Sequence, residues 1–245
     1  MRKRLDQEMV ARGLVQSRAR AGDLIRRGAV LVSGRVANKA GQLVDPTVEL
    51  IVDAAANAHV ARSGLKLSAG IAHFGFDACN RTALDVGSST GGFTQVLLEN
   101  GARLVYAVDV GKDQLHASLR GDPRVVSIER QDARTLTRAQ VPEPVDAIVA
   151  DVSFISLRDV LSVPLRFAAA SCWLVALVKP QFEAGRGTLD KRGVVRDPAE
   201  QERAVHEVSR FLAECGWHVC GSVPSPLPGK EGNQEWLIGA INEQR

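Results

Sequence analysis

Residues 82–94 constrain the fold of this chain more than any other stretch. An apolar run, Thr-Ala-Leu-Asp-Val, meets the turn Gly-Ser-Ser-Thr-Gly-Gly, and an apolar helical pattern follows over residues 93–98. This order predicts a strand, a tight loop and a helix, which is the opening of an α/β sheet that binds ligands beyond the carboxyl ends of its strands. Gly87, Gly91 and Gly92 lack a Cβ atom, so the backbone can turn tightly there and approach a ligand closely.

The acids beside this loop indicate which ligand it binds. Asp85 lies in the first strand, and a second apolar run, 104–108, ends in Asp109. The carboxylate of Asp109 can accept hydrogen bonds from both hydroxyls of a ribose. The spacing G-x-x-x-G-G differs from the G-x-G-x-x-G of dinucleotide enzymes, and the sequence has no Gly-Lys-Ser/Thr phosphate loop. We therefore expect a nucleoside cofactor without a pyrophosphate, and S-adenosylmethionine fits best.

Strands and helices alternate through the rest of the chain. Further apolar runs predict strands over residues 125–128, 145–150, 173–178, 218–223 and 235–241. Helices are predicted over residues 62–74, 154–170 (with a kink at Pro164) and 198–215, and a loop over residues 181–198. Together with the two strands described above, this alternation predicts a doubly wound, Rossmann-like α/β fold with a mostly parallel, seven-stranded sheet.

The N-terminal part of the chain has a different pattern. Helices are predicted over residues 1–12 and 18–27, the second capped by Ser17, and strands over residues 29–32, 35–39 and 48–52. Residues 1–65 hold 11 Lys and Arg against 6 Asp and Glu, whereas the remaining residues hold 20 against 22. This excess of positive charge predicts a surface for a polyanion.

One motif in this region is specific. The pattern Leu-Val-x-Ser-Arg-x-x-Ala-x-x-Leu-Ile-x-x-Gly-x-Val-x-Val-x-Gly resembles the small RNA-binding domain of bacterial ribosomal small-subunit protein four. The resemblance covers about residues 1–55 and implies RNA contacts for Arg18, Arg20, Arg26, Arg27, Arg35 and Lys39. Arginine suits this role because its planar guanidinium binds phosphate through two hydrogen bonds. We expect an α+β RNA-binding domain at residues 1–56, a linker at 57–63 and a catalytic domain at 64–245.

Four motifs in the rest of the chain resemble the TlyA family. They are Ser-Gly-Leu-Lys-Leu (63–67), Asp-Val-Gly-Ser-Ser-Thr-Gly-Gly-Phe-Thr (85–94), Ala-Asp-Val-Ser-Phe-Ile-Ser-Leu (150–157) and Val-Lys-Pro-Gln-Phe-Glu (178–183). Members of that family join the RNA-binding domain to an FtsJ-like methyltransferase and are described as rRNA 2′-O-methyltransferases or hemolysins. One departure is Ser63, which stands where Gly-Gly is common before Leu-Lys.

The resemblance implies a catalytic tetrad of Lys66, Asp151, Lys179 and Glu235. A ribose 2′-hydroxyl is a poor nucleophile until a base takes its proton, and we expect Lys179 to be that base. Lys66 would orient the hydroxyl, and the two acids would balance charge and position the lysines. Asp151 and Lys179 follow adjacent predicted strands, and Glu235 reaches the same edge if the last strand runs antiparallel.

The resemblance also implies how the cofactor is bound. The residues expected to contact S-adenosylmethionine are Asp85, Gly87, Ser88, Gly91, Gly92, Asp109, Asp132 and Asp151. Of these, Asp109 would hold the ribose, Asp132 would face the adenine amine, and Asp151 would serve both the cofactor and the tetrad. The expected partner is ribosomal RNA, free or in a ribosomal subunit.

Other chemistries have little support in the sequence. The four cysteines show no C-x-x-C spacing, and the five histidines have neither a nucleophile partner nor metal-ligand spacing, so no metal site is expected. Scattered cysteines in apolar runs indicate reduced thiols and a cytoplasmic protein. The longest apolar run, 167–178, holds 12 residues, short of the ~20 that span a bilayer, and no secretion signal is visible.

Three alternative functions stay open at this stage. A nicotinamide-dependent oxidoreductase is disfavoured by the glycine spacing and leaves the tetrad without a role. A membrane-active protein would agree with the hemolysin description, but the sequence has no long apolar segment and no strongly amphipathic helix. The third alternative is an RNA-binding protein without catalytic activity. It is disfavoured because such a protein would not require an intact tetrad.

Overall fold

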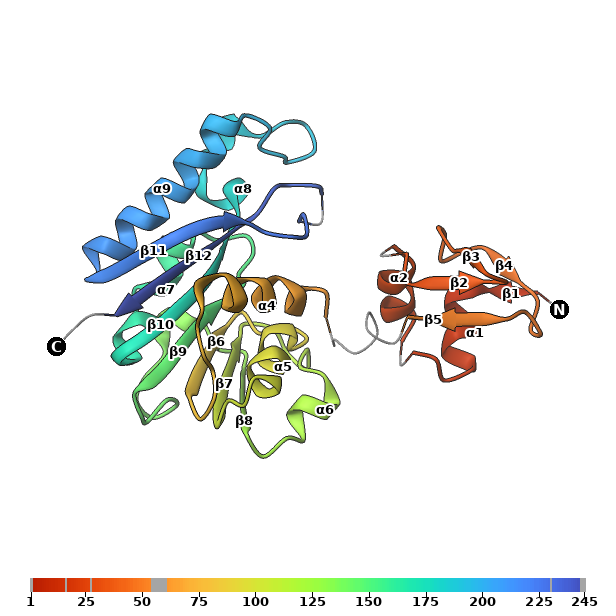
Figure 1. Ribbon diagram of the computed structural model, residues 1–245, viewed down its shortest axis with the longest axis horizontal. Coiled ribbons are helices and arrows are strands. Elements are labelled where there is room, and N and C mark those ends of the chain that lie inside the picture. Colours follow the sequence, from red (N-terminus) through yellow and green to blue (C-terminus); the bar gives the residue numbers. More distant parts are fainter. Residues whose placement is uncertain (1, 16, 27, 54–60, 230, 243–245) are drawn as a thin grey trace. The chain divides into compact units, whose positions relative to one another are not determined.

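The computed structural model describes residues 2–15, 17–26, 28–53, 61–229 and 231–242. The chain divides into two compact units, Met1–His59 and Val60–Arg245, each of which is described by itself (Figure 1). The predicted linker, residues 57–63, stays a prediction. Residues 57–60 lie outside the described residues, and Ser63 already begins a helix.

In its described residues, the N-terminal unit packs two helices against two small sheets. The helices are α1 (Leu5–Ala11) and α2 (Arg18–Arg26). The three-stranded sheet has the order β3-β2-β5 (Arg35–Val36, Val30–Val32, Leu50–Val52), and the two-stranded sheet pairs β1 (Lys3–Arg4) with β4 (Leu43–Val44). Leu5, Met9 and Leu24 are fully buried in its core. As predicted, Ser17 caps α2, accepting a hydrogen bond from the backbone N–H of Arg20 at 3.1 Å.

Two predictions for this unit were wrong in part. The first residues do not extend the helix over 1–12, because Lys3 and Arg4 pair with Val44 and Leu43 as an antiparallel strand. The strand predicted over 35–39 ends at Val36. Strand β4 was missed because two residues are too few to show an alternating pattern.

The second unit is built on a seven-stranded sheet in the order β11-β12-β10-β9-β6-β7-β8. The strands are β6 (Thr82–Val86), β7 (Leu104–Asp109), β8 (Val125–Glu129), β9 (Val145–Ala150), β10 (Ala168–Val178), β11 (Trp217–Pro224) and β12 (Trp236–Asn242). Strands β10, β9, β6, β7 and β8 are parallel neighbours, and β12 runs antiparallel to both β10 and β11. The predicted mostly parallel, seven-stranded sheet is confirmed, and the antiparallel direction of β12 meets the condition under which Glu235 reaches the same edge as Lys179.

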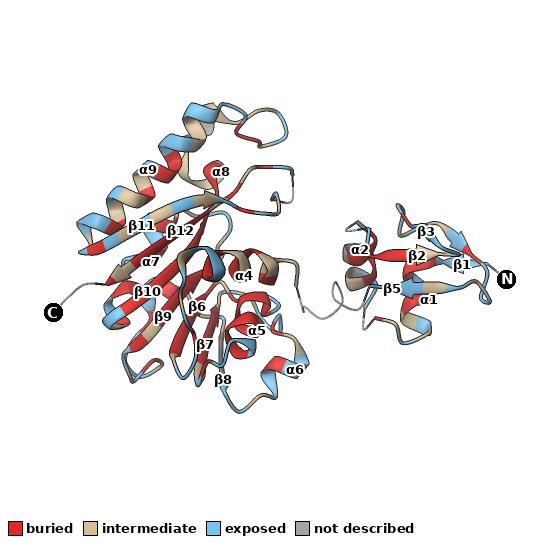
Figure 2. Ribbon diagram, viewed as in Figure 1, coloured by how far each residue is buried: buried red, intermediate tan, exposed pale blue. Residues whose placement is uncertain are grey.

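Helices cover both faces of this sheet (Figure 1). They are α4 (Ser63–Phe74), α5 (Gly92–Glu99), α6 (Ala117–Arg120), α7 (Leu157–Leu161), α8 (Pro180–Glu183) and α9 (Pro198–Glu214), with 3₁₀ turns at Ala133–Thr135, Pro164–Phe167 and Arg186–Thr188. Helices α7 and α9 pack on one apolar layer and α4 and α5 on the other. Strand β6 is buried along its whole length, and β9 and the last seven residues of β10 are almost entirely buried, because both faces of the sheet are covered (Figure 2).

The helix predicted over 154–170 was wrong. Phe154 has a left-handed φ of +68°, and Ser156 caps the short helix α7. Pro164 then starts a 3₁₀ turn, since proline has no N–H to continue a helix. Residues 168–170 extend β10 instead. The predicted loop 181–198 contains α8 and a 3₁₀ turn.

None of the helices within the described ranges combines the length and the apolar character that crossing a membrane requires.

Candidate active site

The sheet brings the predicted tetrad to one edge. Asp151 follows β9 and Lys179 follows β10, and these strands are parallel neighbours. Val178 pairs with Trp236 at the start of the antiparallel strand β12. The residues one step beyond this pair are Lys179 and Glu235, so the backbone register itself sets them beside each other.

Lys179 has two polar partners at this edge. Its Nζ lies 2.7 Å from Oδ1 of Asp151 and donates a hydrogen bond to Oγ of Ser153 at 2.9 Å. Lys179, Asp151 and Ser153 all line a cavity of about 200 Å³, whose lining also includes Arg62 and Ser63 at the start of α4. The ammonium group of Lys179 is therefore held in a fixed position on the wall of a small cavity.

Lys66 and Glu235 form a second ion pair, and it is closed to solvent. Nζ of Lys66 donates to Oε2 of Glu235, and both side chains are almost completely buried. Lys66 lies one turn of α4 beyond Arg62 and Ser63, on the helix face that borders the small cavity. The guanidinium of Arg62 donates to the carbonyl of Pro228, which ties this end of α4 to the loop before Glu235.

A larger cavity of about 490 Å³ adjoins the first and shares Gly87, Ser89, Asp151 and Ser153 with it. Asp109 lies on its wall, where the carboxylate accepts hydrogen bonds from the backbone N–H groups of Ser89 at 2.8 Å and Gly111 at 2.7 Å. Each carboxylate oxygen keeps a further lone pair for a hydroxyl. Apolar wall residues are Val108, Val110, Phe154, Ile155 and Val160. A carboxylate beside apolar walls fits a nucleoside.

Residues of the glycine loop line both cavities, and its glycines have different roles. Gly87 has a φ of +83°, and a Cβ atom there would lie 2.7 Å from the carbonyl oxygen of Asp151. Ser88 is buried and lines the small cavity. Gly91 and Gly92 are not among the described residues that line either cavity. A Cβ atom at Gly92 would collide with Ser63, so this glycine permits close packing of the loop against α4.

The two remaining predicted cofactor residues are placed differently from each other. Asp85 is fully buried beneath the loop, lines neither cavity among the described residues, and accepts a hydrogen bond from Oγ1 of Thr94 at 2.6 Å. Burial raises the pKa of Asp85 to about 7. Asp132 lines the larger cavity, but its carboxylate contacts the guanidinium of Arg134 at 2.6 Å, which holds the pKa of Asp132 below its usual value.

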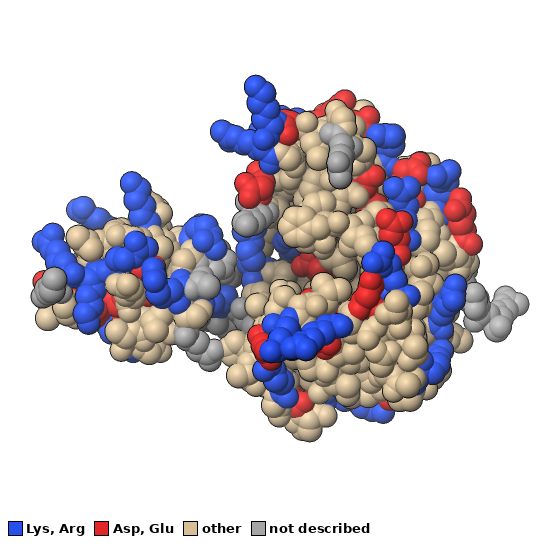
Figure 3. Space-filling model, turned by 180° about the vertical axis from the view of Figure 1, so that it is seen from behind, with Lys and Arg blue, Asp and Glu red and all other residues tan. Residues whose placement is uncertain are grey.

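The predicted RNA-binding side chains are spread over the N-terminal unit, whose visible surface is rich in Lys and Arg (Figure 3). Arg18, Arg26, Arg35 and Lys39 are exposed and Arg20 is half-buried, whereas Arg27 lies outside the described residues. Arg18 contacts the buried carboxylate of Asp6 at 3.0 Å.

Sequence reasoning missed several residues near these sites. Arg4 also binds Asp6, at 3.0 Å, but nothing in the sequence links it to Arg18. Three further residues lie within the family motifs described above, namely Ser153, Phe154 and Glu183. Their membership of these motifs is the sequence feature that could have marked them as part of the site. No group of three or more His, Cys, Asp or Glu side chains that could hold a metal ion occurs in the part of the chain that the structure describes.

The fold, with two adjoining cavities at the carboxyl edge of its sheet, is that of an α/β protein that binds its ligands at this edge. Residues 59–241 match the model of the FtsJ-like methyltransferase family, and residues 3–50 match the S4 domain. The chain is 46% identical to "16S/23S rRNA (cytidine-2′-O)-methyltransferase TlyA" of Mycobacterium tuberculosis, over 97% of this chain and 89% of that protein. This chain belongs to the TlyA family of FtsJ-like methyltransferases.

Two further similarities agree with this membership. "Hemolysin A" of Brachyspira hyodysenteriae is 38% identical over 97% of this chain and 99% of that protein. A solved structure of a hemolysin-named protein from Streptococcus thermophilus superposes with a TM-score of 0.78 at 36% identity, covering 98% of this chain and 88% of that chain.

Proposed function

We propose that this protein transfers a methyl group from S-adenosylmethionine to a ribose 2′-hydroxyl of ribosomal RNA. The observation that carries the proposal is the position of Lys179. Its ammonium group is held by Asp151 and Ser153 on the wall of a small cavity, and that cavity opens beside a larger one suited to a nucleoside.

The larger cavity fits the adenosine part of the cofactor. Its volume of about 490 Å³ lies in the range of ~300–1,000 Å³ typical of small-molecule sites. The carboxylate of Asp109, fixed by two backbone N–H groups, would hold the ribose. Gly87 lets the loop pass close to the backbone carbonyl of Asp151, because it has no side chain that would collide with it. When bound, S-adenosylmethionine supplies a methyl group on a positively charged sulfur.

The small cavity fits the nucleotide that accepts the methyl group. A lysine amine acts as a base only in its neutral form, and Nζ of Lys179 is placed to take the proton of a hydroxyl bound in this cavity. Asp151 and Ser153 hold Nζ in place from two sides. Lys66 and Glu235 fix the start of α4 against the loop before β12, and so hold Arg62 and Ser63 in the lining of the cavity.

Ribosomal RNA as the substrate is supported by the relatives and by charge. The Mycobacterium tuberculosis relative is named for cytidine 2′-O-methylation of 16S and 23S rRNA. The S4 domain match coincides with the basic part of the chain, and its exposed cations can neutralise phosphates. A ribosomal substrate places the activity in the cytoplasm.

The direct test is to map 2′-O-methyl groups on rRNA from cells with and without this gene, by their resistance to alkaline cleavage. We expect at least one site to lose its methyl group in the deletion strain and to regain it with the wild-type gene. The Lys179→Ala gene is the matched control and should not restore it. Identical methylation maps from both strains would refute an rRNA 2′-O-methyltransferase.

A second test concerns the N-terminal unit. A chain that starts near Ala58 should keep cofactor affinity but lose most affinity for rRNA. The affinity of the full chain should fall steeply with salt, because each neutralised phosphate releases counterions. Equal rRNA affinity of the two chains at matched salt would remove the N-terminal unit from substrate recognition.

A further inference from the structure

Two motif segments at the active-site edge are joined by a series of side-chain contacts. The segment 151–157 follows β9, and the segment 179–183 follows β10. Lys179 contacts Asp151 and Ser153 at the start of these segments. Further along, the rings of Phe154 and Phe182 lie with their centroids 5.3 Å apart. Glu183 closes the series by binding the start of α7.

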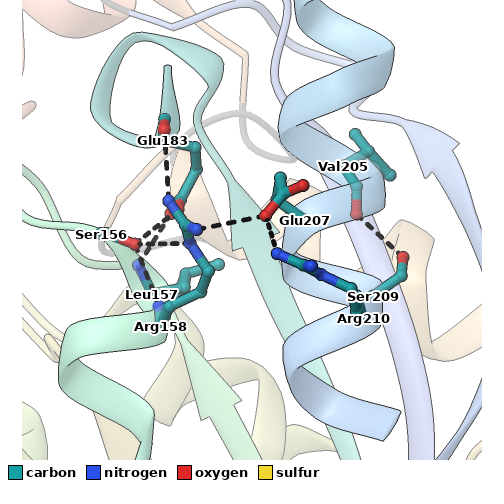
Figure 4. A network of polar contacts seen from close by, with 8 residues as sticks. All are labelled: Ser156, Leu157, Arg158, Glu183, Val205, Glu207, Ser209 and Arg210. Atoms are coloured by element: carbon teal, nitrogen blue, oxygen red, sulfur yellow. Dashed lines mark hydrogen bonds and ion pairs between the residues drawn. The ribbon is translucent and has the colours of Figure 1, made fainter. Parts of the chain in front are cut away.

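Glu183 is the most enclosed member of the series. Its side chain is 1% exposed, and its carboxylate accepts hydrogen bonds from Oγ of Ser156 at 2.6 Å and from the backbone N–H of Leu157 at 2.7 Å (Figure 4). Such hydrogen bonds to a charged group are strong, and an unpaired partner left buried is costly. The carboxylate therefore clamps the end of α8 to the start of α7.

The segment 151–157 needs an external clamp. Phe154 is 90% exposed and has a left-handed φ of +68°, a conformation that is unfavourable for a bulky side chain. Strain of this kind persists only where surrounding contacts hold the backbone in place. Ser153, which holds Lys179, is the residue directly before Phe154.

The same network contains a second glutamate that provides a natural comparison. The guanidinium of Arg158 lies between Glu183 and Glu207, with 3.4 Å contacts to each carboxylate (Figure 4). Glu207 is on α9, its side chain is 30% exposed, and its described polar partners are Arg158 and Arg210. It touches neither of the two active-site segments through those contacts.

We propose that Glu183 is a positioning residue for methyl transfer, acting by holding segments 151–157 and 179–183 in register so that Lys179, Asp151 and Ser153 keep their geometry. This role rests on the proposed function of Lys179. Glu183 does not line either cavity among the described residues, so it acts through the residues it positions rather than on the substrate.

The test compares Glu183→Ala, Glu183→Gln and Glu207→Gln in the full chain. With rRNA and cofactor saturating, Glu183→Ala should lower the single-turnover rate by about 100-fold, since a small misplacement near the chemistry has an effect of this size. Glu183→Gln keeps the length of the side chain and one acceptor oxygen. Its single-turnover rate should therefore be about ten-fold higher than that of Glu183→Ala. Glu207→Gln also removes one carboxylate charge beside Arg158, and its single-turnover rate should stay within about two-fold of wild type.

Binding and stability separate positioning from folding. The Kd for cofactor and for rRNA should change by less than about five-fold in both Glu183 variants, so that the loss falls on the rate and not on binding. If Glu183→Ala behaves like Glu207→Gln in rate, Glu183 is not a positioning residue. The same conclusion follows if the rate per folded molecule is unchanged and only the melting temperature falls.

Hydrogen exchange gives a readout that does not depend on the substrate. Peptides covering 151–157 and 179–183 should exchange faster in both Glu183 variants and at the wild-type rate in Glu207→Gln. Unchanged exchange in both segments overturns the proposal. If the wild-type protein methylates no rRNA, the proposed function fails, and the exchange result still decides whether Glu183 holds the two segments together.

Discussion

The two lysine–carboxylate pairs of the active-site edge have the same chemistry but different access. Lys66 and Glu235 have side chains that are 7% and 4% exposed, and neither is among the described residues that line a cavity. Lys179 and Asp151 are 9% and 19% exposed, and both line the small cavity. We infer from this comparison that Lys66 and Glu235 maintain the shape of the site, in place of the predicted role of Lys66 in orienting the hydroxyl, and that Lys179 and Asp151 meet the substrate.

The largest expected effect comes from the accessible pair. Lys179→Arg keeps the positive charge, but a guanidinium does not deprotonate at usable pH, so the variant should lose about 10²–10⁴-fold in single-turnover rate. Cofactor affinity should stay nearly intact. Lys179→Ala is the control and should be equally inactive. A near wild-type rate for Lys179→Arg would show that Lys179 is not the base and would leave the two pairs with similar roles.

The closed pair should respond mainly in stability. Lys66→Met leaves the carboxylate of Glu235 buried without its cation, which should lower the free energy of unfolding by about 3–5 kcal/mol. The double variant Lys66→Met/Glu235→Leu should recover a large part of this loss, because it leaves no buried charge. Denaturant titrations of the three proteins measure the effect. Equal stability of Lys66→Met and wild type would mean that this pair is not buried in solution.

A third carboxyl group extends the comparison, because it is buried without a lysine. Burial raises the pKa of Asp85 from 3.8 to about 7, and its Oδ1 has no hydrogen-bond partner in the described part of the chain. Between these two values the folded protein keeps a proton that the unfolded chain has lost. The stability that Asp85 contributes is therefore full below about pH 4 and falls by about 1.4 kcal/mol per pH unit up to about pH 7.

Asp85→Asn tests this effect, since the amide oxygen can still accept the hydrogen bond from Thr94. Free energies of unfolding without cofactor, measured from pH 4.5 to 8, should decline less with pH in the variant than in the wild type. All other titrating groups are shared, so the difference between the two curves isolates Asp85. Parallel curves would contradict the raised pKa.

The smallest expected effect concerns the cofactor cavity. Asp109→Ala should weaken binding of S-adenosylmethionine by about 1–3 kcal/mol, the contribution of hydrogen bonds to a charged group. It should leave the two lysine pairs in place, since Asp109 contacts neither in the described structure. Calorimetry measures the affinity, with Glu207→Gln as a charge control. Unchanged affinity would argue against Asp109 as the ribose ligand.

The sequence was most informative where local pattern and fold agree. The strand over 145–150 was predicted to the residue, because buried parallel strands are nearly continuous apolar runs. The helix over 154–170 was wrong, because its apolar residues have no period that separates a short helix from the strand that follows. Phe154 also adopts a left-handed backbone conformation, which its residue type does not predict.

The sequence by itself determined the class of the fold and the glycine loop. It also predicted the four tetrad residues, of which Lys66, Asp151 and Lys179 lie in motifs of about ten residues or fewer. Only the tertiary structure decided how those residues pair. Lys66 binds Glu235, Lys179 binds Asp151, and Glu183 clamps two segments that are distant in the chain. Such pairings depend on strand order and on burial, which arise when the whole sheet assembles and which no local pattern encodes.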